Sequence, residues 1–304
     1  QSILLMDSLF PPSATAALLG ACLLATVMAA DEPGDLPGGT AFLRDLSYVA
    51  SGHERQRLDL AYFTEGDPRP LLLWIHGGAY MGGDKAENHA IWGDLMRRGY
   101  AVATINYRLS GDAKWPAQIE DCKAAIRFLR AHAWEYRIAP DRIAVWGSSA
   151  GGHLAALVGA SGGAKEFDVG GHLDQSSAVS CAVDLFGPAD FETMPQFRRP
   201  DSPEARLWGR PTSEALEMAR SASPIRYLSS ATPPILILHG DADEVVSLEQ
   251  SRQFHAAMRK AGAPGELVIL PGVGHSHVEV WMRKRDDILG FFQRHLRMDA
   301  AVRP

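Results

Sequence analysis

The chain has 304 residues, of which 46% are hydrophobic and 22% are charged. This balance is ordinary for a globular protein and excludes general disorder, and the length suits one α/β domain built around a single core. The formal net charge is −6 and the pI is near 6.0. The longest Lys/Arg run is Arg283-Lys284-Arg285, which we expect on the solvent face of a terminal helix, so a phosphate backbone is not expected as a ligand and no nucleic-acid partner is predicted.

An apolar segment that ends in small residues runs from Ala14 to Ala30 and is followed by the polar stretch DEPGDLPGGT. This pattern predicts that residues 1–30 are a signal peptide, which makes the protein secreted or periplasmic. The basic residues that usually open such a signal are missing, since the first Lys or Arg is Arg44. Two alternatives stay open: Leu19-Gly20-Ala21-Cys22 resembles a lipobox whose Cys22 carries a lipid anchor, or the segment is an uncleaved helix. The run is short for a stable membrane span.

Residues 31–304 are predicted to form one domain in which strands and helices alternate. In chain order, two strands of alternating polarity at 45–51 and 56–63 suit an antiparallel edge, and a buried strand follows at 70–78. The remaining predicted strands are 100–110, 142–147, 180–187, 233–240 and 266–272, separated by helices at 90–98, 116–133, 151–159, 248–260 and 280–296. The alternation predicts an α/β fold, with a mostly parallel sheet covered by helices on both faces.

The interval 190–224 interrupts this rhythm, because it is rich in Pro, Arg and Glu and shows no strand pattern. In an open α/β sheet the ligand crevice lies beyond the carboxyl ends of the strands, so an insertion after the strand that ends at Gly187 is expected to form a small cap over it. The alternative is a plain surface excursion. Phe197 and Trp208 in this interval offer either a flat apolar wall to a ligand or an anchor to the core.

Cysteine usage points to neither a disulfide framework nor a metal site. Cys122 falls on a predicted helix and Cys181 in an apolar strand, so both are expected to be small core residues. The histidines and cysteines lack the spacing of metal ligands. We therefore expect no metal and no cofactor, and the sequence leaves the oligomeric state open.

The strongest chemical signal is Gly147-Ser148-Ser149-Ala150-Gly151, a G-x-S-x-G sequence between an apolar strand and a helix. A tight strand-to-helix turn needs residues without bulk at Gly147 and Gly151, and it exposes the central hydroxyl at the start of the helix. The pattern therefore predicts a nucleophile elbow with Ser149, and not Ser148, as the nucleophile.

A hydroxyl needs a base to remove its proton, and the base needs an orienting carboxylate. The order that goes with this elbow is Ser, then Asp or Glu, then His. Asp243 and His275 follow two apolar strands, so both are expected at the same sheet edge as Ser149. Asp241 and Glu244 remain alternatives for the acid, and His277 remains an alternative for the base.

The negative oxygen of a tetrahedral intermediate requires waiting hydrogen-bond donors. His76-Gly77-Gly78-Ala79-Tyr80 follows a buried strand, and its glycines allow backbone amides to turn toward the crevice. We predict an oxyanion hole formed by Gly78 and Ala79, with Gly77 shaping the loop and the amide of Ala150 as the partner donor. His76 is expected to be a hydrogen-bonded structural residue.

Taken together, these motifs resemble the BD-FAE-type esterases, which are similar to the hormone-sensitive-lipase-like carboxylesterases and include feruloyl and acetyl-xylan esterases. The resemblance runs from about Asp45 to about Leu296. It rests on the segments His76–Tyr80, Asn106–Leu109, Trp115–Cys122, Gly147–His153, Phe186–Asp190, His239–Asp243 and Gly272–His275, which recur in the family's order. Ser247 and Tyr80 depart from the family's common Pro and Trp.

The resemblance implies an α/β-hydrolase fold and the triad of Ser149, Asp243 and His275. It also implies a serine carboxylesterase that works through an acyl-enzyme. A cap of this size is too small to cover a long acyl chain, so acetyl to butyryl esters, or feruloyl esters on plant polysaccharide, are the expected substrates. Two alternatives stay open: a serine exopeptidase, in which a bulky aromatic usually replaces Ala150, and a silent binding module, which usually lacks a triad residue.

Overall fold

The computed structural model describes residues 33, 35–194 and 199–297. The predicted signal peptide (1–30), with the alternative anchor at Cys22, lies outside the described residues, and so does Phe197. Within the described ranges, no helix is both long and apolar enough to cross a membrane.

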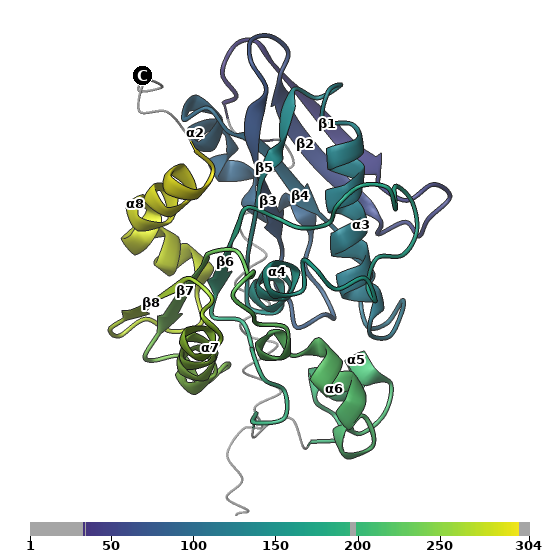
Figure 1. Cartoon of the computed structure of the whole chain (residues 1–304), viewed down its shortest axis with the longest axis vertical. Coiled ribbons are helices and arrows are strands. Elements are labelled where there is room, and N and C mark those ends of the chain that lie inside the picture. Colours follow the sequence, from purple (N-terminus) through teal and green to yellow (C-terminus); the bar gives the residue numbers. More distant parts are fainter. Residues whose placement is uncertain (1–32, 34, 195–198, 298–304) are drawn as a thin grey trace, which may run out of the picture.

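One sheet of eight strands, in the order β1-β2-β4-β3-β5-β6-β7-β8, forms the centre of the molecule (Figure 1). The first three in that order pair antiparallel, and every pair from β4 and β3 to β7 and β8 is parallel. The strands are β1 Thr40–Ser47, β2 Arg57–Phe63, β3 Arg69–Ile75, β4 Ala101–Ile105, β5 Ile138–Ser148, β6 Cys181–Leu185, β7 Ile235–Gly240 and β8 Gly265–Leu270. This order and the helices on both faces confirm the predicted α/β-hydrolase fold.

Helices cover both faces of the sheet. Side chains of α3, α4 and α7 pack on one face, and those of α2 and α8 pack on the other. Figure 1 shows where these helices lie around the sheet. The bounds of these helices are α2 Trp92–Arg97, α3 Ala117–Ala131, α4 Ala150–Ala160, α7 Leu248–Ala261 and α8 His277–His295. A 3-10 helix, η2 Lys85–Ile91, directly precedes α2. The short helices between β6 and β7 are α5 Pro203–Trp208, η4 Thr212–Glu214, α6 Leu216–Ala222 and η5 Pro224–Arg226.

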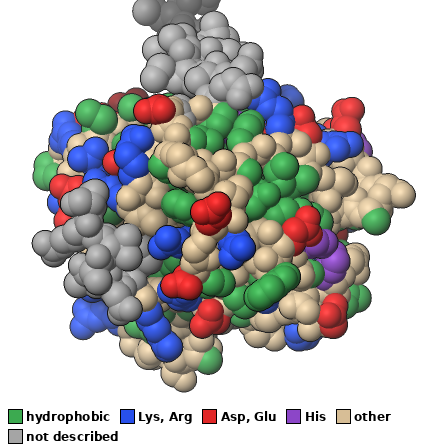
Figure 2. Space-filling view, turned by 90° about the horizontal axis from the view of Figure 1, so that it is seen from above, with side chains coloured by type: hydrophobic (Ala, Val, Ile, Leu, Met, Phe, Trp, Pro, Cys, Tyr) green, Lys and Arg blue, Asp and Glu red, His purple; other side chains and the backbone are tan. Residues whose placement is uncertain are grey.

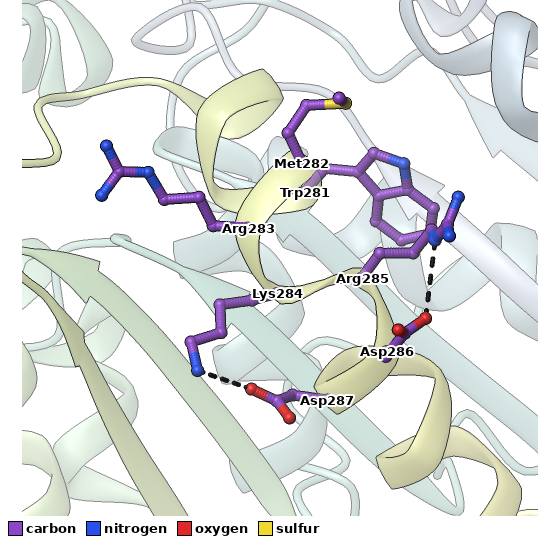
Figure 3. Close-up of a pocket in the computed structure, with 7 residues that line it drawn as sticks. All are labelled: Trp281, Met282, Arg283, Lys284, Arg285, Asp286 and Asp287. Atoms are coloured by element: carbon purple, nitrogen blue, oxygen red, sulfur yellow. Dashed lines mark hydrogen bonds and ion pairs between the residues drawn. The ribbon is translucent and has the colours of Figure 1, made fainter.

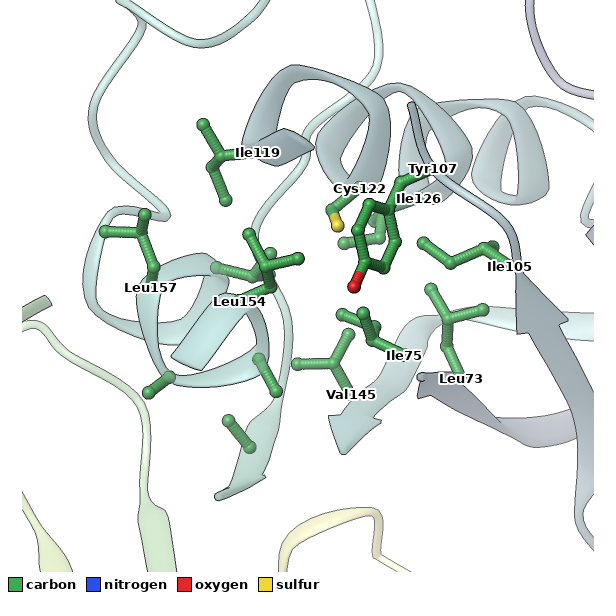
Figure 4. Close-up of a cluster of buried hydrophobic side chains, with 14 of the residues drawn as sticks. Leu73, Ile75, Ile105, Tyr107, Ile119, Cys122, Ile126, Val145, Leu154 and Leu157 are labelled. Atoms are coloured by element: carbon green, nitrogen blue, oxygen red, sulfur yellow. The ribbon is translucent and has the colours of Figure 1, made fainter. Parts of the chain in front are cut away.

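The alternation of side chains along β3 divides the core into two layers. Leu73 and Ile75 face α3 and α4, in the cluster that Figure 4 shows together with Cys122 and Leu154. Trp74, one residue away, lies in the cluster on the opposite face. Burial of each such side chain stabilises the fold by about 1.5–3 kcal/mol. Cys122 and Cys181 are free and buried, which confirms their prediction as core residues.

The predicted bounds of most strands differ from those in the structure, and two of the differences have a clear local cause. The strand expected at 45–51 begins earlier, at Thr40, and ends at Ser47. Its pairing with β2 shifts register between Leu43 and Leu46, and Asp45 has a φ of 58°, so a bulge breaks the alternation that the prediction used. The strand expected at 100–110 ends at Ile105, where its antiparallel pairing with Leu58 stops.

Trp208 does not offer an open wall. Its side chain is 2% exposed and meets the rings of Phe191 and Trp115 edge to face, at centroid distances of 5.5 and 6.0 Å. The prediction of an apolar wall for a ligand is therefore wrong for Trp208, and the alternative, an anchor to the core, is confirmed.

The basic run on α8 faces solvent, as predicted. Arg283 pairs with Glu279 at 2.6 Å, Lys284 with Asp287 at 2.8 Å and Arg285 with Asp286 at 3.6 Å. A recess of about 380 Å³ between residues 281 and 287 is lined by these side chains and by no member of the predicted triad (Figure 3). On the face seen in Figure 2, basic and acidic side chains are interspersed.

Candidate active site

Ser149 occupies a sharp turn between β5 and α4. Its φ is 56° and its ψ is −121°, a backbone conformation that residues other than glycine rarely adopt. The turn is tight because α4 begins directly against β3: a Cβ on Gly151 would lie 2.0 Å from the carbonyl oxygen of Ile75, and one on Gly147 would lie 2.5 Å from it. The structure thus places Ser149 at the position that the elbow motif predicts.

The structure brings Ser149, His275 and Asp243 together at the carboxyl ends of β5, β8 and β7. Nε2 of His275 lies 2.8 Å from Oγ of Ser149, and Nδ1 lies 2.7 Å from Oδ2 of Asp243. A carboxylate can only accept, so Nδ1 carries the proton and Nε2 of the neutral ring is free to accept the proton of the Ser149 hydroxyl. The arrangement can perform nucleophilic catalysis with a general base.

The side chain of Asp243 is fully buried yet held as an anion. Its Oδ1 accepts hydrogen bonds from the amides of Val245 and Val246 at 2.8 and 2.9 Å. Burial alone would raise the pKa of this carboxyl, but hydrogen bonds from His239 and His275 outweigh burial and hold that pKa well below its usual range. A lasting negative charge at this point can stabilise an imidazolium on His275.

The alternative acids and base have other surroundings. Asp241 accepts from the amide of Gly272 at 2.7 Å and so joins the two loops that carry the predicted acid and base. Glu244 is exposed. His277 opens α8 and lies against the ring of Trp74, and burial, followed by the nearby His275, lowers its pKa. Among the described residues, none of the three forms a hydrogen bond with Ser149.

The loop after β3 lies beside the Ser149 turn. Gly78, Ala79 and Tyr80 have φ values of 97°, 53° and 61°, and the carbonyl of Gly78 accepts from the amides of Met81 and Gly82. A Cβ on Gly77 would lie 2.9 Å from the carbonyl oxygen of Ser148, so this glycine allows the loop and the turn to approach each other.

Ala150 is the first residue of α4. Its amide therefore has no partner within the helix. A donor is thus available directly after Ser149, the chain position from which the predicted oxyanion hole takes its second donor.

Buried side chains hold the loop after β3 in place. His76 stacks on Tyr107 at 4.4 Å, its Nδ1 donates to the carbonyl of Gly77 at 2.8 Å, and its Nε2 accepts from Arg55 at 3.2 Å. Burial, aided by Arg55, lowers the pKa of His76 to about 4, so the ring is neutral at neutral pH. His76 is the hydrogen-bonded structural residue that was predicted, whereas Arg55 has no sequence motif that would have identified it.

Tyr80 has a second support that the sequence analysis missed. Its hydroxyl lies 2.9 Å from Nδ1 of His153 on α4, and Nε2 of His153 lies 2.6 Å from the carbonyl oxygen of Ala222 at the end of α6. The carbonyl only accepts, so Nε2 donates to it and Nδ1 accepts from Tyr80. One histidine thus connects the loop after β3, the helix that begins after Ser149 and the segment between β6 and β7.

Comparison with known proteins relates this chain to a family of hydrolases and to several esterases. The BD-FAE family model matches residues 58–258. Esterase LipC of Mycobacterium tuberculosis (strain ATCC 25618 / H37Rv) is 32% identical over 213 residues, which cover 68% of this chain and 53% of LipC. The chain spans about half the length of the curated relatives it matches.

Two solved structures are similar over most of this chain. A truncated carbohydrate esterase from gut microbiota superposes with a TM-score of 0.80 and 32% identity, covering 86% of this chain and 99% of that one. An acetyl ester-xyloside bifunctional hydrolase from Caldicellulosiruptor lactoaceticus superposes with a TM-score of 0.65 and 27% identity, covering 85% of this chain and 99% of that one. With the family model covering most of the chain and the elbow, acid and base loops in the family's order, this protein belongs to the BD-FAE family.

Proposed function

We propose that this chain is a serine carboxylesterase. The observation that carries the proposal is the continuous hydrogen-bonded path from Oγ of Ser149 through His275 to Asp243, beside the loop of Gly78 and Ala79. The likeness to several esterases supports the same reaction.

In the proposed mechanism, Nε2 of His275 takes the proton of Ser149 while Oγ attacks the ester carbonyl carbon. The amides of Gly78, Ala79 and Ala150 bind the negative oxygen of the tetrahedral intermediate, and Gly77 shapes the loop. The intermediate collapses as His275 returns the proton to the leaving alcohol, and Ser149 keeps the acyl group. Water then attacks this acyl-enzyme through the same base, which releases the acid and regenerates Ser149.

A covalent probe tests this assignment. We expect a fluorophosphonate to label the protein once, at Ser149, with a matching loss of 4-nitrophenyl acetate hydrolysis. Pre-steady-state hydrolysis should show a burst of 4-nitrophenol equal to the number of active sites, because the good leaving group makes acylation faster than deacylation and the acyl-enzyme accumulates. Labelling at another serine, or hydrolysis that survives full labelling, would refute the mechanism.

The proposed substrates are acetyl to butyryl esters or feruloyl esters, carried on polysaccharide. We propose that residues 190–224 form a small cap over the site. Supporting contacts are the bond from His153 to Ala222, and the bond from Trp115 Nε1 to Ser221 Oγ at 2.8 Å. Such a short cap gives little room for a long chain to leave water, at about 0.8 kcal/mol per methylene. The likeness to a carbohydrate esterase and to an acetyl ester-xyloside hydrolase supports a sugar-linked ester.

Substrate size is tested by comparing kcat/KM for acetyl, butyryl, octanoyl and feruloyl esters of one alcohol. Among the esters with alkyl acyl groups, we expect the acetyl and butyryl esters to give the highest kcat/KM. Feruloyl esters should also be hydrolysed. Faster turnover of the octanoyl ester than of the acetyl ester would contradict the proposal. Release of acetate or ferulate from acetylated or feruloylated xylan would extend it to polysaccharide.

We also propose that residues 1–30 direct the protein out of the cytoplasm, with Cys22 as the site of a lipid anchor in the alternative case. The apolar segment that ends in small residues supports this. Expression of the chain in a bacterial host, followed by fractionation and mass spectrometry of the mature N-terminus, tests it. An uncleaved protein confined to the cytoplasm would overturn it.

A further inference from the structure

His239 is a buried histidine that the proposed mechanism does not use. It lies in β7, one residue before the end of the strand, and its side chain is fully buried. Its Nδ1 lies 2.7 Å from the hydroxyl of Ser251 on α7. Its Nε2 lies 2.9 Å from the carbonyl oxygen of Val246 and 3.3 Å from Oδ2 of Asp243.

The partners of this ring determine where its proton lies. The carbonyl of Val246 only accepts, so Nε2 of His239 carries a hydrogen, and in a neutral ring Nδ1 accepts from the hydroxyl of Ser251. The N–H of Nε2 donates to the carbonyl of Val246, and Oδ2 of Asp243 lies 3.3 Å from the same nitrogen. Oδ2 of Asp243, the oxygen that accepts from His275, thus faces a second imidazole N–H.

We propose that His239 is a positioning residue that shares Oδ2 of Asp243 with His275 and thereby sets how strongly Asp243 stabilises the imidazolium of His275. It does not touch the substrate. The N–H of His239 neutralises part of the charge on Oδ2. Its hydrogen bond to the carbonyl of Val246 also fixes the loop that carries Asp243 relative to β7. The carbonyl of Val246 fixes the tautomer, and the hydroxyl of Ser251 on α7 bonds the opposite ring nitrogen.

The other groups around this pair are few among the described residues. Phe186 packs against both rings, with centroids 6.2 Å from His239 and 4.5 Å from His275. Asp184 of β6 is the buried carboxyl that interacts electrostatically with His239, and His277 of α8 interacts electrostatically with His275. The variants below leave both of these groups in place.

The inference rests on the proposed function, and a matched pair of substitutions tests it. His239→Gln keeps an amide donor near the position of Nε2, whereas His239→Asn keeps a polar group toward Ser251 but is too short to reach Asp243. In His239→Asn the acid limb of the kcat/KM profile for 4-nitrophenyl acetate should move to higher pH by roughly half a unit to one unit, because Asp243 then holds the imidazolium more strongly. We expect kcat to fall roughly tenfold with little change in KM, because His239→Asn also removes the bond to Val246 and leaves the loop that carries Asp243 less well positioned. His239→Gln should keep the wild-type limb.

Ser251→Ala is the structural control. It removes a hydrogen bond from the same ring but leaves the donor to Asp243, so it should lower stability without moving the acid limb. A purely structural role for His239 would reduce the number of titratable active sites in the variants and leave the limb of the remaining enzyme unchanged. An unshifted limb in His239→Asn, or equal shifts in His239→Asn and His239→Gln, overturns the proposal.

A readout that needs no turnover separates this proposal from the proposed function. In the Ser149→Ala background, NMR titration should show the ring of His275 titrating at higher pH in His239→Asn than with His239 intact. This test holds even if the wild-type chain hydrolyses no ester, an outcome that would refute the proposed function alone. Should His239→Asn not fold, ¹⁵N NMR of the wild-type protein must find the His239 proton on Nε2, and a proton on Nδ1 alone overturns the inference.

Discussion

The hydroxyl of Ser149 is held by a backbone conformation that costs about 1–3 kcal/mol in isolation. Packing of α4 against β3 maintains it, since the φ of 56° occurs where Gly147 and Gly151 lie against the carbonyl of Ile75. Strain of this kind is stored where a reactive group must be presented at a fixed angle, which fits the role proposed for Ser149.

Replacement of Ser149 by Ala should abolish ester hydrolysis, by up to roughly 10⁶-fold, because the covalent route is lost and only substrate binding and the oxyanion hole remain. The measurement is kcat/KM for 4-nitrophenyl acetate on protein whose folding is verified by circular dichroism. Ser148→Ala is the matched control, since Ser148 is the adjacent serine. Its substitution is expected to lower kcat/KM far less. Near-normal turnover by Ser149→Ala would refute its role as nucleophile.

We expect His153 to make the stability of the fold depend on pH. Burial lowers its pKa from 6.5 to about 4, so the folded state keeps the ring neutral where the unfolded chain binds a proton. The folded state thus binds this proton more weakly than the unfolded chain does. The contribution of His153 to stability is therefore fully present above pH 6.5 and is lost as the pH falls toward 4. A difference of about 2.5 pH units corresponds to about 3 kcal/mol.

This effect is checked by urea unfolding of the wild type and His153→Gln between pH 4 and 7.5. The variant should be less stable at pH 7.5, because the bonds to Tyr80 and Ala222 are altered, but its stability should vary less with pH. Parallel pH curves for the two proteins would show that His153 is not the source of the dependence.

At the scale of elements, the start of α4 is fixed by its close approach to β3. Gly151→Ala would place a Cβ 2.0 Å from the carbonyl oxygen of Ile75, a contact that requires the backbone to move. We expect a loss of stability of several kcal/mol and a displaced Ser149. Thermal unfolding and kcat/KM measure the two effects.

Gly163→Ala is the control for that substitution, because a Cβ at Gly163 meets no atom within 4 Å. It should change the melting temperature by no more than a few degrees and leave kcat/KM unchanged. Equal melting temperatures for Gly151→Ala and the wild type would contradict the packing argument.

For the whole molecule, we expect residues 31–304 to fold and to hydrolyse esters without residues 1–30. The sheet begins at Thr40, and the predicted triad and oxyanion loop lie after it. The measurement compares the melting temperature and kcat/KM of the shortened protein with those of the full chain. An insoluble or inactive shortened protein would show that residues 1–30 contribute to the fold.

Local patterns in the sequence were enough to predict the fold class and the sharp turn at Ser149. The elbow requires small residues at Gly147 and Gly151, between an apolar strand and a helix, and this constraint acts within one turn of chain. The strand and helix alternation predicts the parallel sheet for the same reason, because buried strands between helices need apolar residues over their whole length. The predicted bounds of β1 were wrong because the bulge at Asp45 broke the alternation, and the predicted end of β4 was wrong because its pairing stops at Ile105.

Only the tertiary structure selected among the distant partners of Ser149. Asp241, Asp243 and Glu244 share one loop, and the sequence could not separate them, nor could it separate His275 from His277. The selection depends on distances between residues far apart in the chain: Ser149 and His275 are separated by 126 positions and by 2.8 Å in space. The same dependence on distant contacts applies to Trp208, Arg55 and His239. Only the packing of the complete sheet and its helices brings each of these side chains against its partners.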